Sequence, residues 1–183
     1  MALQLYKVSV PGSMMLLGEH AVLAGKQAIV VAVHKRLHMQ LTPTNTDLVT
    51  ITDTRLGSMT QSIYNFETIA PFKFVSRAIL EFKSKIKSGF NLDINSEFSS
   101  TIGLGSSAAV TVATVAVLSK WLDPEPYTLD QIFTIAKKIM LAVQGVGSGA
   151  DVAASVFGGV LNYKVQPSAC TYYNLPVIPD CTA

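Results

Sequence analysis

One uncharged stretch, from Phe98 to Ser119, constrains the fold of this chain more than any other feature. The stretch begins with glycine, serine and threonine, which are typical of loops, and continues as an apolar run from Ala108 to Leu118. As a helix, that run would be only ~16 Å long at ~1.5 Å per residue, whereas the hydrocarbon core of a bilayer is ~30 Å thick. The pattern therefore predicts a loop followed by a helix buried in a protein core, and not a membrane span.

The composition agrees with a well-packed core. Of the 183 residues, 49% are hydrophobic and only 14% are charged, which excludes a disordered chain. The net charge of +2 disfavours nucleic-acid binding. The N-terminus lacks the basic and apolar regions of a signal peptide, and two cysteines, Cys170 and Cys181, predict reduced thiols in a cytoplasmic protein. So few charges also indicate that a second domain or a second subunit, as in a homodimer, covers part of the surface.

Strands and helices are mixed along the chain, which predicts an α+β or α/β fold with most of the chain in one domain. Alternating or β-branched runs predict strands at 3–10, 28–33, 35–41, 48–52, 92–94 and 160–165. Apolar spacing and capping signals predict helices at 72–86, 107–121, 128–144 and 151–156. Pro11-Gly12 is expected to end the first strand, and Thr128 with Gln131 to form a capping box.

The motif at the start of the buried helix reads Gly103-Leu104-Gly105-Ser106-Ser107-Ala108-Ala109. Glycines let a backbone approach a ligand closely, and the free N–H groups at a helix start form a site for phosphate. The serines can cap the helix or contact phosphate oxygens and Mg²⁺. An ordinary serine N-cap on a core helix is the alternative. The loop is not a Walker A motif, because no Gly-Lys-Ser/Thr follows the glycines.

A second glycine-rich turn, Gly147-Ser148-Gly149-Ala150-Asp151, precedes another apolar stretch. An aspartate in this position is expected to be partly buried. It can accept a proton from a substrate hydroxyl, orient that hydroxyl or bind a metal. The alternative is an aspartate that merely caps the short helix from Val152.

A third candidate is the segment from Pro11 to Val22, in which Glu19 and His20 follow an apolar run and lie next to Gly18. An acid and an imidazole at the end of a strand suit a polar substrate. The alternative is a turn with a surface histidine.

Taken together, the three segments resemble, in order and rough spacing, the motifs of the GHMP kinases. The resemblance runs from about Val8 to Tyr163. It implies an N-terminal domain like the second domain of ribosomal protein S5, with a mixed sheet and a left-handed βαβ unit. Residues 1–165 would form this domain, and 166–183 would begin the crossing to a ferredoxin-like C-terminal domain that is missing from this chain.

The resemblance also implies a kinase active site that uses ATP and Mg²⁺. Residues Gly103, Leu104, Gly105, Ser106, Ser107, Ala108 and Ala109 would then hold the triphosphate. Ser107 would lie near the metal and Asp151 would be the catalytic aspartate. The acceptor would contact Glu19, His20, Ser148 and Gly149.

The sequence departs from the family pattern at two positions. Mevalonate kinases have a lysine where this chain has Ser13, which leaves Lys26 or a residue of the second domain to supply that charge. They also have a glutamate eleven positions before the catalytic aspartate, a Mg²⁺ ligand, where this chain has Met140.

The acceptor stays open between two compounds of the isoprenoid (mevalonate) pathway. The segment Gly18-Glu19-His20-Ala21-Val22 resembles that of mevalonate kinases, and the run from Gln144 to Ala154 resembles that of phosphomevalonate kinases. The function predicted first is therefore phosphorylation of mevalonate, with 5-phosphomevalonate as the alternative. A sugar or an amino-acid alcohol is a further alternative acceptor. Ser13 and Met140 favour a last alternative, a non-catalytic sensor, which the intact glycine loop and Asp151 oppose.

Overall fold

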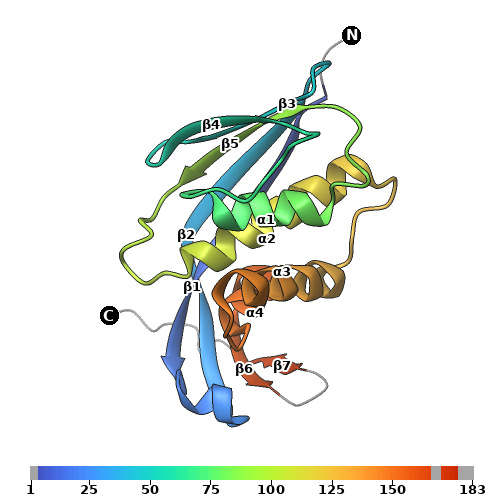
Figure 1. The fold of residues 1–183 in the computed structure, drawn as a ribbon. Coiled ribbons are helices and arrows are strands. Elements are labelled where there is room, and N and C mark those ends of the chain that lie inside the picture. The colour runs from blue at the N-terminus through green and yellow to red at the C-terminus, as the bar shows by residue number, and fades with distance from the viewer. Residues whose placement is uncertain (1–3, 166–169, 177–183) are drawn as a thin grey trace.

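The computed structural model describes residues 4–165 and 170–176. It consists of one seven-stranded sheet with four α-helices packed against one side (Figure 1). The strands hydrogen-bond in the order β4-β3-β5-β2-β6-β7, and β1 pairs with β2. Only the β3–β5 pair is parallel among the described strands. This mixed sheet confirms the predicted α+β class.

The elements follow the sequence prediction closely in order and less closely in length. The strands are β1 (Tyr6–Leu17), β2 (Gln27–Pro43), β3 (Leu48–Asp53), β4 (Gly57–Ser62), β5 (Phe90–Ser96), β6 (Val160–Val165) and β7 (Cys170–Asn174). The helices are α1 (Lys73–Glu81), α2 (Ser106–Leu122), α3 (Leu129–Gln144) and α4 (Ala150–Phe157), together with a short 3-10 turn, η1 (Ala21–Ala24).

The long hairpin of β1 and β2 forms the backbone of the sheet. The prediction that Pro11-Gly12 ends the first strand is wrong, because β1 continues to Leu17 and absorbs the break as a shift in register between Pro11 and Ser13. One residue of β1 there faces three residues of β2, 33–35, so the bulge lies on β2 and changes the side-chain alternation of that strand. As a result, Val30 before the bulge and Leu37 after it both face the core.

Helix α2 is the centre of the helical layer. It lies against β1 and β2 and also contacts α1, α3 and α4, which explains why it is apolar on every side. The hydroxyls of Thr111 and Thr114 are buried and donate to the carbonyls of Ser107 and Val110, each at 2.7 Å. No helix among the described residues is long and apolar enough to cross a membrane.

Local signals set several element ends. The predicted capping box is confirmed at the start of α3, where the Thr128 side chain accepts from Gln131 N. Asp53 closes the turn after β3 by accepting from Arg55 N and Leu56 N at 2.8 and 3.0 Å. The sequence prediction missed β4, which follows this turn.

The sequence prediction also missed β7, which pairs with β6. It lies within the predicted crossing segment, 166–183. Residues 166–169 and 177–183 of that segment, Cys181 included, lie outside the described residues.

Candidate active site

The glycine loop leads into α2 through a backbone turn that glycine favours. Gly105 is the N-cap of α2 at φ +61°, a left-handed conformation, and no side chain caps the helix. The serine N-cap considered as an alternative is therefore wrong. The first backbone bond of the helix runs from Ala109 N to Gly105 O at 2.9 Å. Earlier amides at the helix start therefore have no partner within the helix and can bind an anion.

The segment of β1 opposite the bulge, at Gly12 and Ser13, packs against this loop. Ser13 N donates to the carbonyl of Leu104 at 3.1 Å, and a Cβ on Gly12 would lie 2.9 Å from the same oxygen. Ser13 is 1% exposed and its hydroxyl has no hydrogen-bond partner. A Cβ on Gly105 would lie only 2.0 Å from that hydroxyl oxygen. The Pro11–Val22 segment thus touches the Gly103–Ala109 loop at Gly12 and Gly105, where a side chain would clash.

A pocket of about 310 Å³ opens beside the start of α2, within the usual size range of ligand pockets, roughly 300–1,000 Å³. Ser106 and Ser107 form its polar side. Its apolar and charged walls come from α1, from the end of β5 and from the turn after β3, and include Phe72, Phe74, Phe98, Leu56, Asp53 and Arg55. The pocket thus joins a mostly apolar slot to the helix start.

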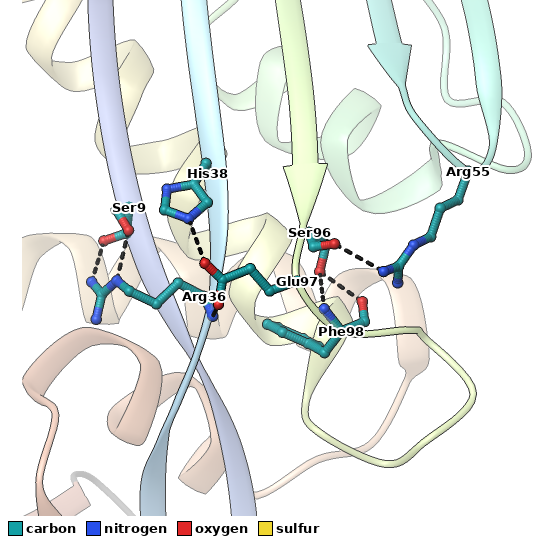
Figure 2. A network of polar contacts seen from close by, with 7 residues as sticks. All are labelled: Ser9, Arg36, His38, Arg55, Ser96, Glu97 and Phe98. Carbon is teal, nitrogen blue, oxygen red and sulfur yellow. Dashed lines mark hydrogen bonds and ion pairs between the residues drawn. The ribbon is translucent and has the colours of Figure 1, made fainter.

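Polar contacts hold the wall of this pocket in place (Figure 2). Glu97 accepts from the backbone N–H of Arg36 at 3.1 Å and pairs with His38, also at 3.1 Å. These contacts lower the pKa of Glu97, the bond to His38 most. Ser96 bonds to both the N–H and the carbonyl of Phe98, and the guanidinium of Arg55 donates to Ser96 O at 2.9 Å. The loop therefore leaves β5 in a defined direction.

The second glycine-rich turn starts α4 in the same way as the first starts α2. Its N-cap is Gly149 at φ +82°, without a side-chain cap. The alternative in which Asp151 caps this helix is therefore wrong, because Asp151 lies within the first turn. Burial, and next the negative charge of Glu19, raise the pKa of the Asp151 carboxyl. The charge of Glu19, from the Pro11–Val22 segment, therefore acts on the carboxyl group of Asp151.

Glu19 and His20 lie in the β1–β2 hairpin. Gly18, at φ +87°, ends β1 where a Cβ would meet the backbone of Gln27 at 2.6 Å. Both Glu19 and His20 are exposed, and His20 is the N-cap of η1 without a side-chain cap bond. Lys26 lies in the same hairpin and is also exposed. Its role as a substitute cation stays a prediction.

Met140 lies where the family pattern has a glutamate. It is 8% exposed and packs between α3 and α2, where the Thr111 hydroxyl lies 3.4 Å from its sulfur. It also borders the small cavity beside Asp151. A thioether in this place cannot act as a Mg²⁺ ligand, because Mg²⁺ takes oxygen ligands.

Comparison with known proteins matches the fold and motifs to one family. Residues 73–159 match the family model described as the GHMP kinases N terminal domain. This part of the chain is therefore a GHMP kinase N-terminal domain.

The individual relatives are mevalonate kinases. The chain is 33% identical to the mevalonate kinase of Pyrococcus abyssi over 98% of its own length and 57% of the relative. It is 34% identical to that of Archaeoglobus fulgidus over 82% of this chain and 50% of the relative. The crystal structure of the Methanococcus jannaschii mevalonate kinase has the same fold, with a TM-score of 0.81 at 24% identity, over 96% of this chain and 56% of that one. The chain therefore spans about half the length of these relatives.

Sequence reasoning missed the pocket walls and the support behind Asp151. The walls come from three separate segments, and no short motif marks Phe98 or Arg55. The support comes from Tyr163, which donates to the Ser148 carbonyl, and from Lys137, which packs against Gly149. These residues lie within the predicted strand 160–165 and the predicted helix 128–144, and no sequence motif marks them.

Proposed function

We propose that this domain binds ATP, with the triphosphate on Gly103–Ala109 and the base in the 310 Å³ pocket. The observation that carries the proposal is the continuity of this pocket with the uncapped start of α2, through Ser106 and Ser107. The phosphates would meet free amides and the positive end of the helix dipole. The aromatic residues Phe72, Phe74 and Phe98 provide an apolar setting for a planar base.

We assign the catalytic role to Asp151. Its raised pKa makes it a stronger proton acceptor than an ordinary aspartate. It takes the proton of the acceptor hydroxyl, the hydroxyl oxygen bonds to the γ-phosphorus, and the bond from phosphorus to the bridging oxygen breaks to release ADP. Most of the rate enhancement in such a transfer comes from positioning and charge stabilisation.

The acceptor would bind between the β1–β2 hairpin and the turn before α4. Glu19 and His20 would contact it from the hairpin, and Ser148 and Gly149 from the turn. The influence of Glu19 on the pKa of Asp151 supports this arrangement.

The oxygen donors present fit Mg²⁺. The described residues contain no group of three or more His, Cys, Asp or Glu side chains placed to hold a metal. Mg²⁺, however, is usually bound by one or two carboxylates together with substrate phosphates and water. Ser107 and Asp151 would be its protein ligands here, and the ion would neutralise charge on the phosphates.

Mevalonate is the acceptor that we favour. The two relatives at 33% and 34% identity are mevalonate kinases. The phosphomevalonate kinase of Streptococcus pneumoniae is 19% identical, with a TM-score of 0.72, over 86% of this chain and 49% of that one. It therefore supports only a common fold. We place the activity in the cytoplasm, in the isoprenoid pathway, with a second domain completing the site.

The test is ADP release by the natural protein in its full length, with mevalonate and 5-phosphomevalonate offered separately. We expect ATP turnover that depends on mevalonate. Turnover with 5-phosphomevalonate alone would move the assignment to the second kinase. A folded protein that binds ATP and turns over neither compound would favour the sensor.

A further inference from the structure

The turn that carries Asp151 is supported from behind by a buried tyrosine. Tyr163 lies on β6 and is 0% exposed, and its hydroxyl donates to the carbonyl of Ser148 at 2.7 Å. That carbonyl belongs to the peptide that joins Ser148 to Gly149, the N-cap of α4. Asp151 follows Gly149 by two residues, in the first turn of the same helix.

Two further residues close around the same turn. The aliphatic stem of Lys137, on α3, lies 3.0–3.2 Å from the position of a Cβ on Gly149. Its ammonium group lies 2.6 Å from the sulfur of Cys170, on β7. Gly149 therefore sits against the lysine stem in a left-handed conformation. The turn is thus contacted by α3 and β6, with β7 holding the lysine.

The electrostatic environment keeps the tyrosine in its donor form. Burial raises the pKa of Tyr163 most, and Cys170 and then the charge of Asp151 raise it further. The raised pKa favours the protonated phenol, which is the form that donates to the Ser148 carbonyl.

We propose that Tyr163 is a positioning residue, whose hydroxyl fixes the Ser148–Gly149 peptide and thereby aims the carboxylate of Asp151 at the acceptor. This inference rests on the proposed function for its effect on turnover, while its effect on the turn itself is independent of that function. A tyrosine that served only the core would be equally well replaced by phenylalanine, because both rings fill similar space.

The chain offers a matched control in Tyr172. Its hydroxyl donates to the Asp130 carboxylate at 2.7 Å, the same length as the bond from Tyr163. Its ring stacks on Phe157, at the far end of α4 from Asp151. Tyr172→Phe therefore removes a tyrosine hydrogen bond of equal length without touching the turn.

The experiment compares Tyr163→Phe and Tyr172→Phe in the full-length protein. One hydrogen bond contributes about 0.5–1.5 kcal/mol, so we expect kcat of Tyr163→Phe to fall by roughly 2- to 12-fold, at about 1.4 kcal/mol per factor of ten. The KM for ATP should not change, and Tyr172→Phe should keep the wild-type kcat. An unchanged kcat in Tyr163→Phe, or equal losses in both variants, would overturn the proposal.

Hydrogen exchange provides a readout that does not need turnover. The amide of Ala153 donates to the Gly149 carbonyl at 2.9 Å and reports on the start of α4. We expect it to exchange several-fold faster in Tyr163→Phe than in wild type or Tyr172→Phe. Equal exchange in the three proteins would refute the inference even if no acceptor supported turnover. Faster exchange without turnover would support the positioning of the turn and refute only the proposed reaction.

Discussion

Substitution of Gly105 by alanine tests the contact between the Gly103–Ala109 loop and Ser13 of β1. The new Cβ meets two costs. The left-handed backbone at φ +61° costs a non-glycine residue roughly 1–2 kcal/mol. The Cβ also falls 2.0 Å from the Ser13 hydroxyl oxygen, and relief of such overpacking typically costs about 1–3 kcal/mol. We therefore expect Gly105→Ala to lower the free energy of unfolding by about 2–5 kcal/mol.

Two further variants separate these costs. Gly103→Ala is the matched control, because Gly103 has φ +74° but no atom within 4 Å of its Cβ position. It should show only the backbone cost of roughly 1–2 kcal/mol. Ser13→Ala removes the clashing oxygen, which has no hydrogen-bond partner, and leaves the Ser13 Cβ at 3.3 Å. In the double variant with Gly105→Ala, about 1–3 kcal/mol should be recovered.

Urea denaturation of the wild type, the three single variants and the double variant measures these free energies of unfolding. Calorimetry measures the affinity of the same proteins for ATP. Gly105→Ala should weaken ATP binding, since the amides at the start of α2 are displaced. A Gly105→Ala protein no less stable than Gly103→Ala would refute the reasoning. So would a double variant in which the loss of the Ser13 hydroxyl recovers nothing.

Two predictions concern the charge on Asp151. Glu19→Gln removes the charge that helps to raise the pKa of Asp151. The acid limb of the kcat–pH profile should therefore move to lower pH. An acid limb that stays in place would show that the two carboxyl groups do not interact. The pKa of Asp151 is higher in the folded protein than in the unfolded chain. Ionisation of Asp151 therefore destabilises the fold, and stability is lost as the pH rises from the ordinary pKa of an aspartate through the pKa in the folded protein. Asp151→Asn should therefore unfold at higher urea concentration than wild type at neutral pH, and this gain should shrink in acid; a less stable variant at neutral pH would contradict the sign.

The sequence was most informative where local chemistry decides structure. The loop residues before Ala108 and the uniformly apolar helix predicted α2, and Thr128 with Gln131 predicted the start of α3. The glycines of the 103–109 loop were predicted as close-approach positions, and Gly105 has a left-handed backbone. These features depend on a few adjacent residues, and the sequence displays them directly.

The features that sequence reasoning missed depend on tertiary contacts. Pro11 fails to end β1 because pairing with β2 continues on both sides of the bulge. The N-caps of α2 and α4 are glycines in left-handed conformations, whereas the adjacent Ser106 and Asp151 made side-chain caps plausible from the sequence. The hydrogen bond from Tyr163 to the Ser148 carbonyl joins β6 to the turn before α4. No local sequence pattern encodes that contact.

The most direct test of this account compares mevalonate-dependent ADP release by full-length wild type and Asp151→Asn at saturating ATP. The substitution keeps the size of the side chain and removes its charge. If Asp151 is the base, kcat should fall by on the order of 10²-fold or more, with the affinity for ATP unchanged. Turnover equal to that of wild type would contradict the central claim and leave Asp151 with a structural role.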